Sequence, residues 1–498
     1  MKALLSTAPY PFTMQIEGPN AALPASSVCG GYLPLRQVLF VAWIVLLPVV
    51  FASSLSLGFE DARAIALCSF AIVGWSAQPG RTPIEYTSLA FLALVTITGA
   101  MDWADAWRGM CQEGIWLIFC GMAMSLALTE TRISQRIAQV LCLKKPTWPW
   151  LVLRLNMVGG LLALCVPSQV VRCQLVVPIA RSIIGQLHLE PLSRRASAVM
   201  IALVISTNHC GAAVLTGGLP NIIAVSGLQH CDIEITWGFW FVRMAPVFWA
   251  VSILGNTAVV LVFSRNERGE LYPSCPEDEA EDAAEAVHLI GTERCILWVF
   301  ALCLVMWSTD VLHHVHPTTI SLVAVLVLFC PVTNLIAFEK LKQVNFPVII
   351  YTASLETLAP LLNAAPHAGP ALSHAADTAV SVAPAGVLRL TMLFLAGMPL
   401  MLCNVAVPVA LLVPELCPGR GLAGAGIEPR LGAMIVAAMP SCTLLPYQNA
   451  PFLIALSISR DIVKERHFVA CLLGNALIGY LAVFPLLLAW WSLLGLNP

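Results

Sequence analysis

Charged residues are scarce in this chain. Lys, Arg, Asp and Glu make up only 11% of the 498 residues, whereas soluble domains contain roughly a quarter. The net charge of −2 offers no strong field to a nucleic acid or an acidic polymer. The sequence also lacks a phosphate-binding loop, a serine-hydrolase elbow, paired metal ligands and any signature of a bound cofactor. We therefore expect no nucleic-acid partner, no cofactor and no enzymatic activity.

Hydrophobic residues are correspondingly abundant, at 58% of the chain. They occur in runs of roughly 17 to 25 residues, the length that a helix needs to cross about 30 Å of hydrocarbon. Most of the 17 cysteines, such as Cys68, Cys120, Cys303 and Cys330, lie in these runs without metal-type spacing. We interpret them as small buried hydrophobic residues. The sequence thus predicts an all-α polytopic membrane protein.

Apolar runs bounded by charges or prolines define the expected spans. Residues 1–35 contain few charges and are expected to form a flexible cytoplasmic tail. The first run, 37–57, is too long for a cleaved signal peptide and lacks a basic flank, so we expect a retained span. The other continuous spans are expected at residues 62–78, 84–100, 114–131, 236–263, 294–313, 317–336, 346–364 and 468–495.

Four further apolar runs are interrupted. Proline and polar residues divide residues 151–190, which predicts two half-helices that enter and leave the membrane by the same face. Glycines and Pro220 divide residues 196–227, which predicts one span broken in its middle. The same two patterns return at 386–417 and 431–459. Together with the continuous runs, they predict about 11 transmembrane spans.

The two halves of the chain echo each other. Gly-Trp-Ser at 74–76 followed by Pro83 recurs as Met-Trp-Ser at 306–308 followed by Pro317. We therefore predict two inverted repeats with re-entrant hairpins and broken helices, after one extra leading helix. The predicted regions are scaffold helices and the start of the first repeat at 36–131, the first transport region at 151–263, an acidic cytoplasmic linker at 264–293, scaffold helices at 294–364 and the second transport region at 386–495.

The placement of basic residues indicates how the chain is oriented. Most of the 26 Lys and Arg residues fall in segments that are cytoplasmic if the amino terminus is inside. The predicted external segments hold only Arg63, Arg108, Arg389, Arg420 and Arg430. We therefore expect a protein of the plasma membrane, or the inner membrane of a bacterium, with a cytoplasmic amino terminus and an external carboxyl terminus.

Broken helices inside a bilayer are costly unless the freed peptide groups face water, protein or a ligand. Half-helix amino ends present N–H groups and partial positive charge to an anion, and freed carbonyls can bind a small cation. Arg172, near the first hairpin tip, favours an anion site because a guanidinium at membrane depth needs an anionic or carbonyl partner. The alternatives for Arg172 are a structural ion pair or the capping of a helix end.

The candidate residues cluster at the two hairpin tips and the two breaks. For the anion we predict contacts from Ser168, Gln169, Arg172, Pro220, Asn221, Asn404, Gln448, Asn449 and Pro451. For a coupling cation we predict contacts from Ser168, Thr207, Asn208, Gly217, Asn404, Ser441 and Thr443.

Two titratable residues are candidates for proton coupling. His209 lies in the first broken span and either transfers a proton or forms a hydrogen bond across a helix interface. Glu356 lies in the middle of an apolar run, where a carboxylate either couples protons or pairs with Arg172.

The order of elements and several short strings resemble the divalent anion sodium symporter family, the dicarboxylate and sulfate carriers. The resemblance covers roughly residues 60–495. The family's Ser-Asn-Thr tips are matched at 168–170 and, loosely, at 404–406, each followed by an apolar run that ends in proline. Its Gly-Thr-Pro-Pro-Asn break resembles residues 217–221, and its second break resembles 446–451.

The resemblance implies an elevator carrier, usually a homodimer, in which hairpins and broken helices move against a scaffold. It also implies two sodium sites, one at each hairpin and broken-helix pair. This chain departs from the pattern: only Ser168 remains at the first tip, the second tip has no hydroxyl, and Arg172 and Glu356 replace small or apolar residues. Sodium coupling, proton coupling and exchange therefore all remain open.

The expected function is the uptake or exchange of a small anion, either a di- or tricarboxylate or an inorganic oxyanion. The first alternative is a cation–proton antiporter that uses Glu356 as its exchanging carboxylate. The second is a membrane-embedded enzyme, in which Glu356 and His209 would have to share one cavity.

Overall fold

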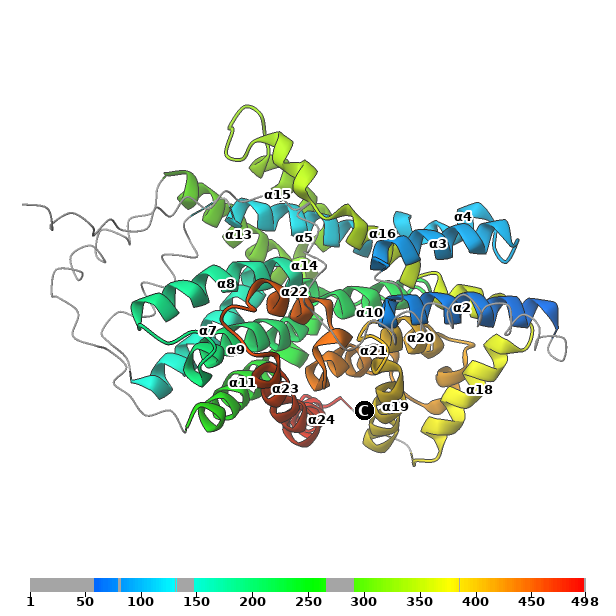
Figure 1. Cartoon of the computed structure of the whole chain (residues 1–498). Helices are drawn as coiled ribbons and strands as arrows, with labels where there is room; N and C mark the ends of the chain where they lie inside the picture. Colours follow the sequence, from blue (N-terminus) through cyan, green and yellow to red (C-terminus); the bar gives the residue numbers. More distant parts are fainter. Residues whose placement is uncertain are drawn as a thin grey trace, which may run out of the picture.

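The computed structural model describes residues 58–78, 82–129, 131, 147–265, 291–384 and 386–496. Within these ranges the regular structure is entirely helical (Figure 1). The helices pack around a core cluster that includes residues of both halves. The predicted tail at 1–35, the first predicted span at 37–57 and most of the predicted linker at 264–293 lie outside the described residues.

Helices of the first half begin close to the predicted spans. They are α2 Phe59–Ala77, α3 Ile84–Ile97, α4 Trp103–Ala106, α5 Glu113–Thr129, α7 Trp148–Cys165, α8 Gln169–Gln186, α9 Arg194–His209, α10 Leu219–Gln229 and α11 Trp237–Ser264. The short helix α4 follows α3 where no element is indicated by the hydrophobic pattern. The long apolar helix α11 confirms the expectation for residues 236–263.

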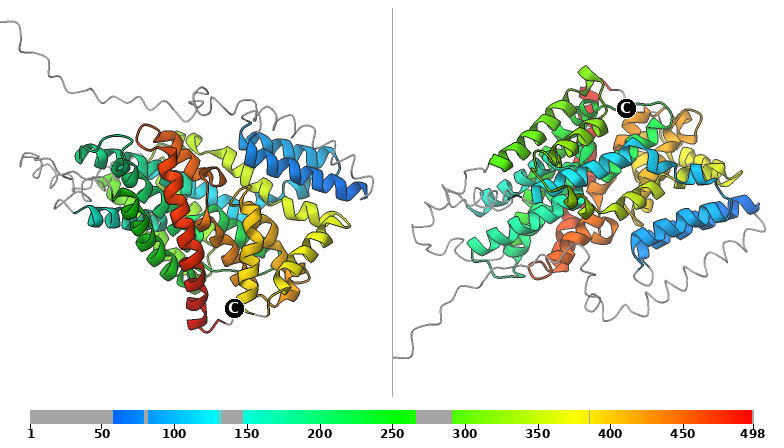
Figure 2. Two further views of the ribbon diagram at one scale, coloured as in Figure 1. Left: turned by 60° about the horizontal axis from the view of Figure 1, so that its bottom comes forward. Right: turned by 90° about the horizontal axis from the view of Figure 1, so that it is seen from above.

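The described helices of the second half are mostly shorter. They are α13 Gly291–Ser308, α14 Asp310–His313, α15 Pro317–Leu328, α16 Phe346–Leu355, α17 Leu358–Ala364, α18 Ala368–Ser381, α19 Val387–Met401, α20 Val407–Leu412, α21 Pro429–Ala438, α22 Ala450–Ile458, α23 Glu465–Ile478 and α24 Phe484–Leu493. A single π turn joins α23 to α24, so that the last span is one long rod (Figure 2).

The expectation of a continuous span at 346–364 is wrong. This run is divided after Leu355 and resumes at Leu358, and α18 then leaves at an angle of 100° to the preceding pair. Pro360 explains the first break, because it has no N–H to donate to the carbonyl of Glu356 four residues earlier. The helix expected over 317–336 likewise stops at Leu328, shortly before Pro331.

Five described segments are long and apolar enough to cross a membrane by themselves, and the bent run 346–381 could be a sixth. The five are Trp148–Cys165, Arg194–Ala213, Trp237–Ser264, Gly291–Ser308 and Glu465–Leu493. By this criterion the described residues fall short of the predicted number of about 11, because breaks and short helices divide many of the apolar runs.

The echoed tripeptides have the same packing role in both halves. The indole N–H of Trp75 donates to the hydroxyl of Ser88 on the next helix at 3.0 Å, and that of Trp307 donates to the carbonyl of Pro317 at 3.3 Å. Ser88 and Ser321 each donate to a carbonyl four residues earlier in their helices. Both tryptophans are buried, so in each half an indole joins two of the described helices.

The predicted reversal within 151–190 occurs at residues 166–168, between α7 and α8. At the start of α7, the Trp148 ring lies 5.7 Å from the guanidinium of Arg195, which follows the end of α8 closely in the chain. The outer ends of both helices therefore lie on one side of the molecule (Figure 1), while Val166 at the reversal is fully buried. The buried reversal agrees with the interrupted run, whereas α7 is by itself long and apolar enough to cross a membrane, so that re-entry by the same face stays a prediction.

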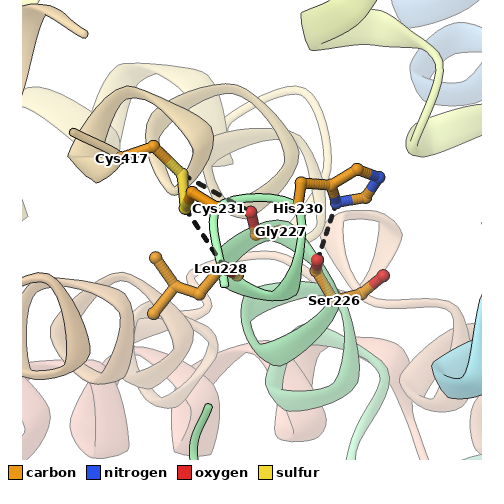
Figure 3. Close-up of a disulfide and its surroundings, with 6 residues drawn as sticks. All are labelled: Ser226, Gly227, Leu228, His230, Cys231 and Cys417. Carbon is orange, nitrogen blue, oxygen red and sulfur yellow. Dashed lines mark hydrogen bonds between the residues drawn. A yellow bond between two sulfur atoms is a disulfide. The ribbon is translucent and has the colours of Figure 1, made fainter. Parts of the chain in front are cut away.

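A disulfide overturns one expectation for the cysteines. Cys231, just after α10, is bonded to Cys417, shortly after α20, with a Cα–Cα distance of 5.9 Å (Figure 3). Their sulfurs lie 3.1 and 3.8 Å from the carbonyl oxygens of Leu228 and Gly227. The bond links the two halves of the chain across 186 residues. Cys68, like most of the described free cysteines, is buried as expected.

Candidate functional site

The first hairpin tip lies against the first broken span. Ser168 caps α8 by accepting a hydrogen bond from the Val171 amide at 3.4 Å. Gln169 opens the helix, and a Cβ added to Gly218 would lie only 3.0 Å from its side-chain nitrogen. The absence of a side chain at Gly218 therefore allows Gln169 to approach the backbone of the break.

Arg172 connects this tip to this break. One terminal nitrogen donates to the carbonyl of Val166 and the other to the carbonyl of Gly217, both at 2.5 Å, and the side chain is 0% exposed. A Cβ at Gly211 would lie 2.4 Å from the guanidinium, so the pocket is closed around it. The carbonyl partners agree with the alternative in which Arg172 caps the ends of interrupted helices.

The ion pair considered between Arg172 and Glu356 is not formed. Glu356 lies in the gap between α16 and α17, beside Ser226 of α10, and its Oε1 atom has no hydrogen-bond partner. Ion pairs in the described part of the chain include Arg181–Asp461 and two pairs that involve histidine, and neither Arg172 nor Glu356 takes part in them.

Asn221 organises the backbone of the first break. Its side-chain amide donates to the carbonyls of Gly211 at 3.0 Å and Val214 at 2.8 Å. Pro220, in the first turn of α10, has no N–H that would need a partner there. Both predicted residues therefore shape the loop that leads into the amino end of α10.

Gln448 organises the second break in a similar way. Its side-chain oxygen accepts from the amides of residues 444–445 at 2.8 Å, and its nitrogen donates to the carbonyl of Met401 at 3.2 Å. The amide of Val405 donates to the carbonyl of Gln448 at 3.0 Å. Asn404 caps the tip by accepting from the amide two residues further on. The second tip and the second break are thus joined like the first pair.

The two broken spans contact each other through a pair of asparagines. The side-chain amide of Asn449 donates to the side-chain oxygen of Asn208 at 3.2 Å. Asn449 precedes α22, whose first turn contains Pro451, and Asn208 lies at the end of α9. Both side chains are buried. This contact completes a continuous set of interactions through both tips and both breaks.

Several buried polar atoms at the first break have no hydrogen-bond partner within the described ranges. They are the hydroxyls of Thr207 and Thr216, the amide nitrogen of Asn208 and Nε2 of His209. An unpaired buried polar group costs roughly 1–3 kcal/mol, so such a group of atoms is suited to a ligand. The hydrogen bond considered for His209 across a helix interface is not formed through Nε2.

The predicted cation ligands of the second half already donate their hydroxyl protons. Ser441 donates to the carbonyl of Ala438 at 2.8 Å, and Thr443 donates to the carbonyl of Pro440 at 2.6 Å. A hydroxyl that donates its proton keeps its oxygen lone pairs and can still coordinate a cation. Both residues are buried next to the break, and their role as cation ligands stays a prediction.

One neighbour of the site was not predicted from the sequence. Tyr351, on α16, places its buried hydroxyl beside the Asn404 side chain at the second tip without forming a hydrogen bond. Its ring packs edge-on against Trp75 at 5.5 Å. The sequence signal that could have indicated Tyr351 was its phenol in an otherwise apolar run, because a buried phenol hydroxyl needs a polar partner.

Comparison with known proteins identifies relatives of the chain. The model of the sodium:sulfate symporter transmembrane region matches residues 34–497. A protein named "Putative malate transporter YflS" from Bacillus subtilis is 25% identical over 311 residues, which cover 59% of this chain and 62% of that protein. The magnetosome protein MamN of Paramagnetospirillum magneticum is 25% identical over 237 residues, covering 47% and 50%. Each match spans less than two thirds of the relative.

Proposed function

Because the chain belongs to the sodium:sulfate symporter family, it is a membrane transporter rather than an enzyme, and we propose that it carries a small anion by alternating access. The observation behind this proposal is that Arg172, Gln448 and the Asn208–Asn449 contact join two hairpin tips and two broken spans. The family assignment gives no support to a cation–proton antiporter.

The anion would lie between the amino ends of the half-helices. α10 and α22 both begin at a break, where their first N–H groups and partial positive charge favour a carboxylate or an inorganic oxyanion. The unpaired donors of Thr207 and Asn208 lie at the same break. Each hairpin tip with its break forms one half-site, and two related half-sites favour a substrate with two anionic ends. A dicarboxylate is therefore our first choice, as the name of the Bacillus relative also suggests.

The moving part would contain both hairpins, both broken spans, α11 and the last span. A buried chain of asparagines ties three of these elements together: Asn256 donates to Asn156 of α7 at 2.7 Å, and Asn475 of α23 donates to Asn256 at 2.9 Å. The Cys231–Cys417 bond adds a second link, between the end of the first broken span and the segment that follows α20. These cross-links support movement as one body against the scaffold, by an elevator mechanism. A homodimer is what the family resemblance implies.

Coupling would use the second hairpin and break. Sodium is the ion that the family implies, and the oxygen atoms of Ser441 and Thr443 can serve as ligands. Protons are the alternative, with Glu356 as carrier, because its carboxyl faces α10 across the boundary between scaffold and moving part. His209 is a second candidate for this role.

The test is transport by purified protein in liposomes. We expect labelled malate or succinate to enter vesicles under an imposed sodium or proton gradient, or in exchange for an internal dicarboxylate. Sulfate and citrate should be offered in parallel to define the substrate class. Absence of uptake and exchange across this anion panel, from protein that is folded and correctly inserted, would refute the proposed function.

Cysteine labelling would test the proposed orientation. Cys231 and Cys417 lie in segments that we expect to be external, where oxidising conditions preserve disulfides. In variants that retain selected cysteines, an impermeant maleimide should modify this pair in intact cells only after treatment with an impermeant reductant. The exposed Cys111 should react without reduction, and the exposed Cys295 only after permeabilisation. Labelling of Cys295 in intact cells would contradict the orientation.

A further inference from the structure

The first hairpin and its break do not fit a bound sodium ion. Sodium requires several oxygen ligands directed at one point, and the carbonyls of Val166 and Gly217 are directed at the guanidinium of Arg172. The two N–H groups thus take the position that a cation would need to use these oxygens. A sodium ion beside this permanent charge would also be repelled.

The guanidinium is fixed in this position. Arg172 lies in the first turn of α8, where its backbone amide donates to the carbonyl of Ser168 at 3.0 Å. The lack of a side chain at Gly211 leaves room for the terminal nitrogens, and the whole residue is buried. Among the residues described, no carboxylate pairs with Arg172. The carbonyl dipoles of Val166 and Gly217 therefore balance its positive charge.

The second hairpin and break differ in this respect. The segments 398–408 and 441–451 contain no charged residue. Their contacts are made by backbone groups and by the neutral side chains of Asn404 and Gln448, with the hydroxyls of Ser441 and Thr443 close by. The two halves are therefore unequal, because one contains a fixed cation and the other contains neutral oxygen ligands.

We propose that Arg172 permanently replaces the sodium ion at the first half-site, so that the chain binds at most one sodium ion, at the second half-site. This inference rests on the proposed transport function and specifies its coupling. A bound sodium ion can leave on the far side of the membrane, whereas a side chain cannot. Without substrate, this fixed positive charge would be balanced by carbonyl dipoles alone and by no anion, so the return of the carrier is favoured only when an anion is bound. Exchange of anions should therefore be faster than net uptake.

Proteoliposomes can test the wild-type prediction. We expect labelled malate uptake to be about tenfold faster into vesicles loaded with unlabelled malate than into empty ones. Sodium should either have no effect on this exchange or activate it with a Hill coefficient of about one. Fast net uptake activated by sodium with a coefficient of about two would overturn the inference while leaving the transport function intact. Absence of any transport would refute both.

Substitution of the arginine provides the second test. In Arg172→Ser the carbonyls and the new hydroxyl are free, so exchange should be lost without sodium and recover as sodium is added. Sodium should also raise the melting temperature of this variant more than that of the wild type. Arg172→Lys keeps the positive charge, so exchange by this variant should not require sodium at the first half-site. Arg181→Ser, on the same helix but with an exposed partner in Asp461, is the matched control.

These variants also keep the inference falsifiable if one of them does not fold. An Arg172→Ser protein that folds and shows the wild-type response to sodium would overturn the assignment. If Arg172→Ser is unstable, the wild-type Hill coefficient and the Arg172→Lys exchange rate decide the question. A sodium requirement that appears in Arg172→Lys, but not in the wild type, would contradict the role of the charge.

Discussion

Substitution of Gly211 by alanine should abolish transport. The added Cβ would lie 2.4 Å from the Arg172 guanidinium and 2.8 Å from the carbonyl oxygen of Gly217. Neither neighbour can yield easily, because both belong to the contact that joins the first tip to the first break. Overpacking of this kind costs typically about 1–3 kcal/mol, and here it also displaces a half-site. Exchange activity in liposomes and the melting temperature in detergent are the measurements.

Gly185→Ala is the matched control for this prediction. Gly185 lies near the end of α8, and an added Cβ would meet nothing within 4 Å. Replacing glycine by alanine in a helix usually stabilises by roughly 0.5–1 kcal/mol, so this variant should be at least as stable as the wild type and fully active. Normal exchange by Gly211→Ala would show that the close packing around Arg172 is not needed for transport.

Loss of either asparagine in the contact between the broken spans should also have a large effect. We expect Asn208→Ala and Asn449→Ala each to reduce exchange by about tenfold or more, since each removes a polar group from the centre of the proposed anion site. Their hydrogen bond at 3.2 Å is the side-chain link between the two breaks that the structure shows. The KM for the anion should rise because ground-state binding is weakened.

A double-mutant cycle separates this role from general damage to the fold. If the two side chains act through their mutual contact, the double variant should be little worse than either single variant. Gln186→Ala, at the exposed end of α8, is a control that should transport normally. Additive losses with unchanged KM would show that the two asparagines act separately and away from the anion.

The positions of the breaks could be predicted from the sequence because their causes are local. Pro167 has no N–H to donate and lies between the end of α7 and the start of α8, and Pro220 lies in the first turn of α10, where no N–H is needed. The interruption at residues 356–357 also has a local cause, the missing N–H of Pro360, but the surrounding run was long and apolar enough to be interpreted as a continuous span. The helix α18 escaped prediction because it is short and only moderately apolar.

The partners within the site could not be predicted in the same way. The sequence indicates that Arg172 needs a carbonyl or an anion, and the structure selects the carbonyls of Val166 and Gly217. The contact of Tyr351 with Asn404 joins α16 to a segment more than 50 residues away, and no local pattern reports it. Candidate residues were found by their type, whereas their partners required the packing of the whole chain.

The sequence by itself determined that this protein is a helical membrane transporter with two interrupted segments in each half. Hydrophobic length and missing proline N–H groups act within a single segment, so neighbouring residues are sufficient to reveal them. Only the tertiary structure decided that Cys231 is bonded to Cys417 and that Asn208 contacts Asn449. Such contacts join segments far apart in the chain, and they depend on how all the helices pack together.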